Sequence, residues 1–447
     1  MRVKLPHTII EICRTLSEAG FQAFVVGGAL RDALLGVTPH DWDITTDALP
    51  EEVEALFPET IPTGREFGTI TVLYNGQPVE VTTMRQEGRY SDRRRPDTVA
   101  FTKDIKLDLK RRDFTVNAMA YNPITKQFAD PFKGRLHLRL RRLVCVGDPK
   151  ERFSEDPLRM LRLIRFQAVL GFKPAGKTVQ AIKPELINAI SAERIGQELA
   201  KMSLGGHLVP AFELFYSSGL LDEVIPELAA CAGVSQGEQH IYDVLGHSVL
   251  AAQRIPPQLH LRWAALLHDI GKPKAKMEND GLNFNNHDKL GAEMAEAILQ
   301  RLRFSNDLIK KVTHLIRFHM YPMGPHMTDK AVRHMIAKVG QEHIFDLIAL
   351  RHADISAMYI DPVQAVRYLT ELRNRVQEVL DAETALTVHD LAVNGHDLMT
   401  ELGIGPCRII GQLLEQLLEL VIDDPSQNNR TALLAAARRL FDADHKP

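Results

Sequence analysis

The sequence predicts an α+β protein, with an N-terminal α/β head followed by an all-helical neck, body and tail. Residues 1–140 alternate short β-rich runs with helical segments, whereas beyond about residue 150 the apolar residues recur at three-to-four spacing nearly to the end. A chain of 447 residues is also too long for one core, so two to four domains are expected. From these changes of pattern we predict a head at 1–140, a neck at 141–235, a body at 236–370 and a tail at 371–447.

The composition is that of an ordinary globular protein. Hydrophobic residues make up 45% of the chain and charged residues 25%, and no apolar run approaches the roughly 18 residues that a membrane span needs. From the lack of such a run we expect no membrane contact, and the N-terminal residues do not predict a secretory signal. Four scattered cysteines lack C-x-x-C spacing, which favours reduced thiols in a cytoplasmic protein. They are Cys13, Cys145, Cys231 and Cys407.

The first part of the head alternates helices and strands. Helical patterns are expected at 6–19, 29–35 and 50–57, and apolar or β-rich runs between them predict strands at 21–26 and 41–46. Such alternation is typical of a sheet covered by helices.

A hairpin completes the predicted head. The β-rich runs 68–74 and 77–83 flank an Asn-Gly pair, which is the strongest short hairpin signal. Glu80 lies in the second run, and the alternation of a strand points it to one face. We expect Glu80 to lie there as a third acid beside Asp41 and Asp43 of the strand predicted at 41–46.

The first strand leads into a candidate phosphate cradle. Gly27 and Gly28 allow the backbone to turn tightly and to approach an anion closely, and the amides of the next helix suit a triphosphate together with Arg31. Asp41 and Asp43 then stand two apart in an extended segment, so that both carboxylates share one face. Carboxylates beside bound phosphates are ligands that Mg²⁺ prefers, which predicts a magnesium site.

The middle of the chain is basic. From Arg85 to Arg165 there are 21 Lys and Arg against 11 Asp and Glu, an excess of ten in a chain whose net charge is −3. This excess indicates a phosphate-rich ligand. Within it, the segment 109–118 is expected to end a helix in three cations and to enter a strand. Arg112 there offers a fork of donors, and Asp113 an acceptor for sugar hydroxyls.

A helix later in the basic region carries a row of polar side chains. We expect Ser154 as its N-cap and Pro157 in its first turn. Four residues recur at intervals of three and therefore lie near one helical face: Asp156, Arg159, Arg162 and Arg165. A carboxylate beside an arginine presents an acceptor and donors to the edge of a base, which would select a nucleotide without a template.

These motifs resemble the nucleotidyltransferase fold of the DNA polymerase β superfamily. The run GGALRDALLG at 27–36, followed by HDWDITT at 40–46, is similar to its class II tRNA branch, which holds CCA-adding enzymes, CC-adding and A-adding relatives, and bacterial poly(A) polymerases. The resemblance covers nearly the whole chain. It implies template-independent addition of CCA, from CTP and ATP, to the 3′ end of tRNA, with no role for DNA.

The same resemblance assigns roles to residues. Asp41 and Asp43, with Glu80 as a third acid, would hold two Mg²⁺ ions. Asp156 and Arg159 would read the Watson–Crick edge of the incoming nucleotide. The nucleotide-contacting residues that it implies are Gly28, Arg31, Arg112, Asp156, Arg159, Arg162 and Arg165, to which the patterns above add Gly27 and Asp113.

The body contains a second set of candidate metal ligands. Of 18 histidines, 11 fall within 240–354, and one of them belongs to an adjacent His-Asp pair. Imidazole and carboxylate together suit divalent transition metals. The spacing H…HD…D resembles the HD superfamily of phosphohydrolases, some of which are HD domains of CCA-adding enzymes with phosphatase or cyclic phosphodiesterase activity. The implied ligands are His247, His268, Asp269 and Asp354, with His287 and either His319 or His314 in addition.

Three alternatives stay open at this point. The first is an A-adding enzyme or a poly(A) polymerase, because the base-reading residues are alike throughout the branch. A loop expected at 87–97, which the family needs for adding the final A, has full length here. The second is a mainly HD metallophosphohydrolase with an RNA-binding head, against which the intact Asp41 and Asp43 argue. The third, a non-catalytic RNA-binding protein, leaves both sets of metal ligands unexplained.

Overall fold

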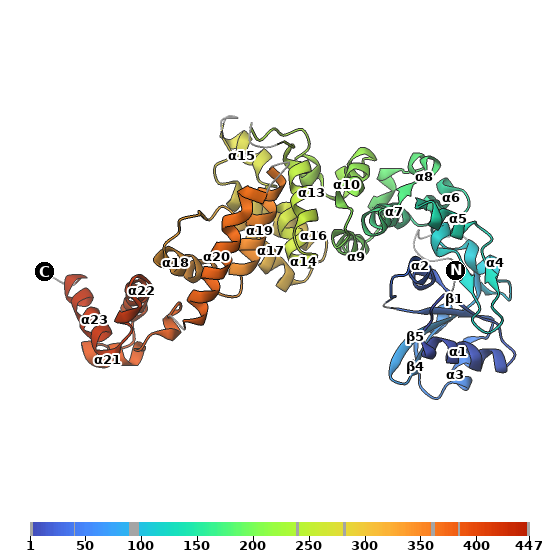
Figure 1. Cartoon of the computed structure of the whole chain (residues 1–447), viewed down its shortest axis with the longest axis horizontal. Helices are drawn as coiled ribbons and strands as arrows, with labels where there is room; N and C mark the ends of the chain where they lie inside the picture. Colours follow the sequence, from blue (N-terminus) through green and yellow to red (C-terminus); the bar gives the residue numbers. More distant parts are fainter. Residues whose placement is uncertain are drawn as a thin grey trace. The chain divides into compact units, whose positions relative to one another are not determined.

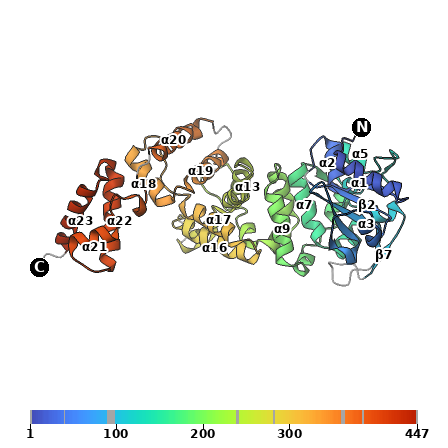
Figure 2. The ribbon, with the colours of Figure 1, turned by 90° about the horizontal axis from the view of Figure 1, so that it is seen from below.

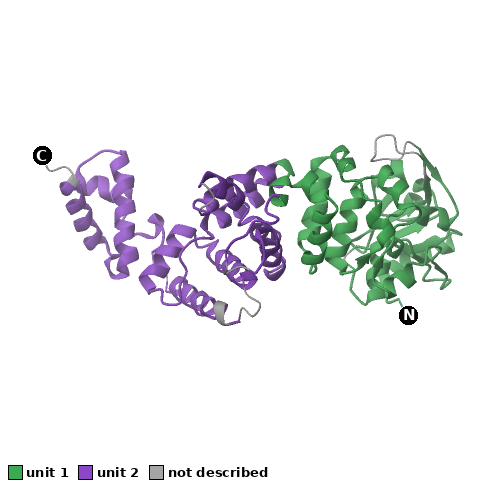
Figure 3. Ribbon diagram, turned by 90° about the horizontal axis from the view of Figure 1, so that it is seen from above, with its two compact units in different colours: residues 1–229, 301–303 green, residues 230–300, 304–447 purple. Residues whose placement is uncertain are grey.

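The computed structural model describes residues 3–39, 41–88, 98–237, 241–279, 283–358, 363–382 and 385–444. The chain divides into two compact units, residues 1–229 with 301–303 and residues 230–300 with 304–447 (Figure 3). The first unit holds the sheet and the second is built of helices, which confirms the predicted α+β class (Figure 1). The finer division into four domains stays a prediction, and most of the loop expected at 87–97 lies outside the described residues.

A seven-stranded sheet forms the centre of the head, in the order β3-β4-β5-β2-β1-β8-β9. β2 pairs antiparallel with β1 and parallel with β5, which puts Asp43, the first residue of β2, in the middle of the sheet. Its strands are β1 (Ala23–Val26), β2 (Asp43–Thr46), β3 (Thr60–Gly64), β4 (Thr69–Tyr74), β5 (Gln77–Thr83), β8 (Ala120–Tyr121) and β9 (Phe128–Ala129). Two small sheets pair β6 (Arg85–Glu87) with β7 (Val99–Phe101) and β10 (Arg142–Leu143) with β11 (Lys173–Pro174).

The predicted hairpin is present as β4 and β5. Asn75 and Gly76 between them have φ of 52° and 74°, the positive values that a two-residue turn compatible with strand twist requires. The turn therefore sets the register of β5, and with it the position of Glu80 opposite Thr71 in β4 and Asp43 in β2.

Helices pack against this sheet from the first residues onward. α1 and α3 contact the sheet and each other, and α2 leads directly out of β1 (Figure 2). One apolar core of the head includes Phe24, Val26, Met84, Leu109 and Ala120, all at most 1% exposed. The helices of the head are α1 (His7–Glu18), α2 (Gly27–Leu35), α3 (Pro50–Leu56), α4 (Ile105–Lys110) and α5 (Gly134–Arg139).

Two local expectations are wrong. The segment after α4 forms a turn and a 3-10 helix (Thr115–Asn117) rather than a strand. The helix expected after Ser154 begins only at Leu158, and a separate short helix precedes it, because Pro157 has no amide hydrogen and its ring clashes with the preceding turn. Ser154 lies inside the short helix, where its hydroxyl donates to the Lys150 carbonyl at 2.8 Å. Those two helices and the others of this region are α6 (Pro149–Glu155), α7 (Leu158–Leu170), α8 (Gly176–Gln180), α9 (Ala192–Ser203), α10 (Leu208–Ser217), α11 (Leu220–Val224) and α12 (Pro226–Ala229).

In the second unit α13, α14, α17 and α19 pack against one another, and α21, α22 and α23 enclose a separate apolar cluster that includes Leu398, Leu417 and Leu433. Within the residues described, no helix is both long and apolar enough to cross a bilayer. The helices are α13 (Val244–Arg254), α14 (Leu259–Leu267), α15 (Lys272–Glu278), α16 (His287–Arg301), α17 (Asn306–Phe318), α18 (Asp329–Val339), α19 (Ile344–Met358), α20 (Val363–Asp381), α21 (Gly395–Leu402), α22 (Arg408–Asp423) and α23 (Arg430–Asp444).

Candidate functional site

The nucleotide-binding candidates of the first unit meet at one cavity. It has a volume of about 490 Å³ and is lined by the start of α2, the turn after α4 and the junction of α6 with α7. Asp43 lines it as well, whereas Asp41 and Glu80 do not. Every residue predicted to contact the nucleotide lines this cavity: Gly27, Gly28, Arg31, Arg112, Asp113, Asp156, Arg159, Arg162 and Arg165.

The three predicted magnesium ligands lie at the start of β2 and in β5. Asp43 is the register partner of Glu80 across the parallel pair. Asp41 precedes the strand, so the extended segment begins later than expected. Burial raises the pKa of Asp43, which Arg112 then lowers and Asp41 raises. Desolvation and the charges of Asp43 and Asp41 raise the pKa of Glu80.

The carboxylates of the head thus repel one another, and a cation among them would offset this repulsion. They do not form a closed cage: in the described part of the chain, three ligand atoms lie within 4.8 Å of one another only in two groups of the second unit. Mg²⁺ commonly takes one or two carboxylates and completes its shell with water and substrate phosphates. The open acidic set therefore fits magnesium.

The absence of a side chain on Gly27 lets Asp43 and Arg112 approach the backbone at the start of α2. Its φ is +73°, and a Cβ placed on it would lie 3.0 Å from both Asp43 Oδ2 and Arg112 Nη1. We expect Gly27→Ala to reduce the activity of this site by about 10- to 100-fold, because backbone strain of about 1–2 kcal/mol and the added methyl both displace the carboxylate. Gly36→Ala is the matched control, since its φ is +78° and nothing lies within 4 Å of its Cβ. Equal losses of steady-state activity in Gly27→Ala and Gly36→Ala would contradict the role given to Gly27.

Arg31 is fixed by two acceptors beneath the cavity. Its Nη1 donates to Asn117 Oδ1 and its Nε to Asp32 Oδ1, each at 2.7 Å, and the side chain is only 9% exposed. Asn117 also donates to Asp113 Oδ1 at 3.1 Å, so one amide orders both an arginine and a carboxylate of the cavity. A held guanidinium suits recognition of phosphate because little entropy is lost on binding.

A charged network spans the head and the helices after it. Arg162 donates from Nε to Asp113 Oδ2 at 2.8 Å, and Glu198 lies 2.8 Å from Arg165 Nε and 3.5 Å from Arg162 Nη1. Burial acts to raise the pKa of Asp113, but Arg162 and hydrogen bonds from Asn117 and the Phe114 amide hold it well below its ordinary value. Asp113 is therefore ionised, and its position is set by these contacts.

Glu198 is a residue that the sequence analysis missed, although an acid on the apolar face of 192–203 was a signal. Its side chain is 8% exposed and neutralises Arg162 and Arg165. We expect Glu198→Gln to destabilise the fold by about 1–3 kcal/mol in urea unfolding, because two arginines lose a buried counter-charge. The KM for nucleotides should rise about tenfold as the arginines move. Glu193→Gln, an exposed change on the same helix, should leave both quantities unchanged.

The two predicted base readers sit at the break between α6 and α7. Asp156 follows the last residue of α6 in an extended conformation rather than being a helical neighbour of Arg159. Its Oδ1 accepts from the Leu158 amide at 3.2 Å and its Oδ2 from Arg194 at 3.1 Å. Arg159 donates from Nη1 to Glu155 Oε2 at 2.8 Å. Arg194 was not a sequence candidate, because it is distant in the chain and follows no recognisable spacing.

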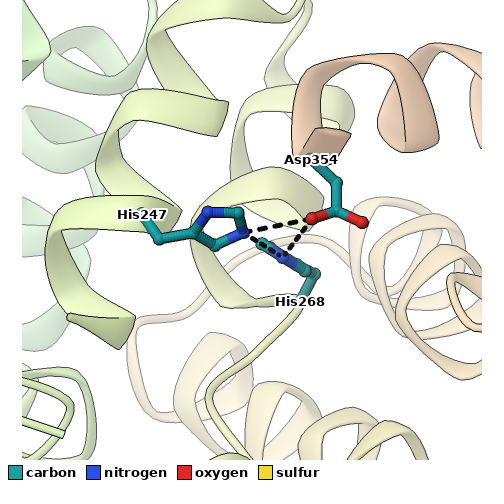
Figure 4. A group of neighbouring side chains, drawn as sticks. All are labelled: His247, His268 and Asp354. Atoms are coloured by element: carbon teal, nitrogen blue, oxygen red, sulfur yellow. Dashed lines mark hydrogen bonds and ion pairs between the residues drawn. The ribbon is translucent and has the colours of Figure 1, made fainter. Parts of the chain in front are cut away.

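The second unit brings together the histidines and aspartates of the body. His247 from α13, His268 after α14 and Asp354 from α19 form one group (Figure 4). His247 Nε2 lies 3.1 Å from Asp354 Oδ1 and 3.3 Å from His268 Nε2. All three residues are buried. The group thus joins residues that are more than a hundred positions apart.

Asp269, His287 and His319 form the adjoining group. Asp269 Oδ2 lies 3.2 Å from His268 Nε2, while its Oδ1 lies 3.4 Å from His287 Nε2. One carboxylate therefore faces both groups. Of the two histidines left open by the sequence, His319 belongs here, whereas His314 Nε2 lies 2.6 Å from the Val339 carbonyl.

The imidazoles of this group are oriented by the backbone. His268, His287 and His319 each place Nδ1 2.6–2.8 Å from the carbonyl three residues earlier, which must accept the proton. A ring that donates its Nδ1 proton in this way can offer the lone pair of Nε2 to a metal ion. The Nε2 atoms of His287 and His319 face each other at 3.1 Å. Burial is the main reason that the pKa of His319 falls to about 4. The ring therefore resists protonation, and its Nε2 is suited to binding a metal ion together with His287 Nε2.

Comparisons with known proteins agree with this architecture. The model of the "Poly A polymerase head domain" matches residues 23–144, and that of the second tRNA nucleotidyltransferase domain matches residues 287–437. The CCA-adding enzyme of Lactobacillus helveticus is 34% identical over 438 residues, covering 96% of this chain and 97% of that protein. The CCA-adding enzyme of Enterococcus faecalis is 32% identical over 437 residues, covering 96% and 94%.

A solved structure shares the fold over nearly its full length. The Bacillus stearothermophilus CCA-adding enzyme in complex with CTP superposes with a TM-score of 0.76 at 27% identity, and the match covers 98% of both chains. The full-length identity above 30% to curated relatives, together with this fold, confirms the predicted family. The chain belongs to the CCA-adding enzymes, a family of tRNA nucleotidyltransferases.

Proposed function

We propose that the head cavity is the site at which this chain adds CCA, from CTP and ATP and without a template, to the 3′ end of tRNA. The observation that carries this proposal is the convergence of all nine predicted nucleotide-binding residues, and of Asp43, on one cavity. Relatives across the family are CCA-adding enzymes, and solved neighbours are complexes with CTP, ATP or tRNA.

Each group of residues has a distinct role in the proposal. Gly27, Gly28 and Arg31 hold the triphosphate at the start of α2, and Arg112 neutralises charge beside Asp43. Asp41 and Asp43, with Glu80, would hold Mg²⁺. When bound, Mg²⁺ activates the tRNA 3′-hydroxyl and offsets charge on the departing pyrophosphate.

The choice of base is assigned to Asp156 and Arg159. Asp156 has its backbone fixed at the end of α6 and its carboxylate held by Arg194, which leaves lone pairs for the amino group of a cytosine or adenine. Arg159 lines the same cavity and supplies donors for ring nitrogens and oxygens.

The test is extension of tRNA transcripts that end at the discriminator base, at C or at CC. Each is incubated with Mg²⁺ and with CTP, ATP or both. Extension of all three to a CCA end is the expected result. Extension of the CC-ended transcript alone, with ATP, would instead make the chain an A-adding enzyme.

We propose a second activity for the second unit, hydrolysis of a phosphate ester at a divalent metal site. The observation that favours it is Asp269, whose two oxygens face the two groups of buried ligands. The imidazoles and carboxylates suit Mn²⁺, Fe²⁺ or Ni²⁺. When bound, such ions generate hydroxide from water near neutral pH and polarise the phosphate. Metal analysis of the purified protein, with hydrolysis of p-nitrophenyl phosphate after Mn²⁺ loading, tests this activity.

We also infer that the protein works in the cytoplasm. All four cysteines are free thiols, and burial raises the pKa of Cys13, Cys145 and Cys231 to about 12 each. Such thiols are unreactive and suit a reducing compartment.

A further inference from the structure

A second cavity, of about 440 Å³, opens beside the metal ligands of the second unit. Asp269, His287, His319 and Asp354 form part of its lining. Amide side chains and apolar side chains also line the cavity, so it offers both polar groups and apolar surface to a ligand. The amide residues are Gln236, Asn285 and Asn286, and the apolar residues are Phe284, Met320 and Met358.

Arg351 lines this cavity and has hydrogen-bond donors beyond the one that it gives to Asp354. It lies on α19, three residues before Asp354, and donates from Nη1 to Asp354 Oδ2 at 2.9 Å. Its Nε is buried and has no hydrogen-bond partner among the described residues. The side chain as a whole is 26% exposed and lines the cavity, so the other N–H groups of its guanidinium can donate to an oxyanion bound there.

Lys272 is the other cation of the lining. Its Nζ donates to Asp269 Oδ2 at 2.7 Å and to Gln236 Oε1 at 2.6 Å, and lies 5.6 Å from the centre of the Phe284 ring. Lys272 is thus held by the cluster, whereas Arg351 still has donor capacity. Arg351 is therefore the better candidate for direct contact with a ligand.

The charge of the cavity selects among phosphate esters. Its lining has three carboxylates, of Asp269, Asp288 and Asp354, against the two cations. Two divalent ions would bring the sum to about +3. A terminal phosphate monoester, with two negative charges, balances more of this charge than a diester, with one.

We propose that Arg351 binds the terminal phosphate of a phosphate monoester at this site, on a nucleotide or on an RNA end. The inference rests on the phosphohydrolase function proposed above and adds to it the residue that binds the phosphate group of the substrate. In the reaction, water forms a bond to phosphorus and the ester P–O bond breaks. The alcohol leaves with one proton, and the phosphate is released as inorganic phosphate.

The experiment compares wild type, Arg351→Gln, Arg351→Lys and the control Arg317→Gln, each loaded with Mn²⁺. Arg317 is exposed on α17 and lies outside the cavity lining. For Arg351→Gln we expect the KM for p-nitrophenyl phosphate to rise about 10- to 100-fold, the size of a lost charge-assisted hydrogen bond, with partial recovery in Arg351→Lys. Binding of inorganic phosphate, measured by calorimetry, should weaken in parallel. Arg317→Gln should match wild type.

The amount of bound manganese shows whether Arg351 binds the phosphate itself or only positions Asp354. Unchanged manganese content with weakened phosphate binding supports the proposal. Lost manganese with unchanged phosphate affinity per loaded site overturns it, and so does faster hydrolysis of bis(p-nitrophenyl) phosphate than of the monoester. No hydrolysis by wild type would instead refute the phosphohydrolase function itself. AMP and a short RNA with a 3′-phosphate then identify which source of monoester is used.

Discussion

Asp43→Asn is expected to reduce CCA addition at least about a thousandfold while the fold is retained. Asp43 lines the nucleotide cavity, pairs in register with Glu80 and lies beside Arg112. Replacing the carboxylate removes a hard anionic ligand at the point where charge develops on the triphosphate, which should cost several kcal/mol of barrier, each 1.36 kcal/mol being about tenfold. The measurement is single-turnover addition of CMP to a tRNA transcript at saturating CTP and Mg²⁺.

Controls for this prediction come from the same part of the chain. Glu51→Gln removes an exposed carboxylate on α3 and should keep full activity. Asp41→Ala should also lose most activity, and retention of more than a tenth of it would refute the role given to Asp41. Urea unfolding of Asp43→Asn should give a midpoint close to that of wild type. Asp43 is half-buried, and burial disfavours its charged form, so replacing the charge with a neutral amide should not destabilise the fold.

Asp269→Asn is expected to remove the metal binding and the phosphohydrolase activity proposed for the second unit while leaving CCA addition intact. Asp269 faces His268 on one side and His287 on the other, so the loss of its charge weakens both halves of the cluster. An amide binds divalent ions far more weakly than a carboxylate, and we expect metal content to fall from about two ions per chain to less than one. Elemental analysis of the purified variant measures this directly.

The matched control for the second unit is Asp307→Asn, an exposed residue on α17 that pairs only with Lys311 among the described residues. It should retain both metal and activity. Thermal unfolding with and without added Mn²⁺ gives a further readout, because a ligand that binds the folded state alone raises its stability. A wild-type Tm that does not respond to Mn²⁺ would contradict the metal site.

Short-range features of the fold could be predicted because they depend on neighbours in the chain. Asn75-Gly76 has the positive φ values of a tight hairpin turn, and Gly27 has the left-handed backbone that the close approach of Asp43 requires. Local patterns failed where a single residue overrode periodicity. Pro157 moved the start of the expected helix from Ser154 to Leu158, and so placed Asp156 outside the helix that carries Arg159.

By itself, the sequence determined which chemical groups this protein carries: the glycine turn, Asp41 and Asp43, the arginines of the basic middle, and the histidines of the body. The tertiary structure alone decided which of them meet. Glu198 beside Arg165, Asn117 beneath Arg31, and His319 rather than His314 in the metal cluster all depend on contacts between distant segments. Residue spacing encodes which face of its own helix or strand a side chain occupies, whereas the packing of whole elements fixes which faces come together.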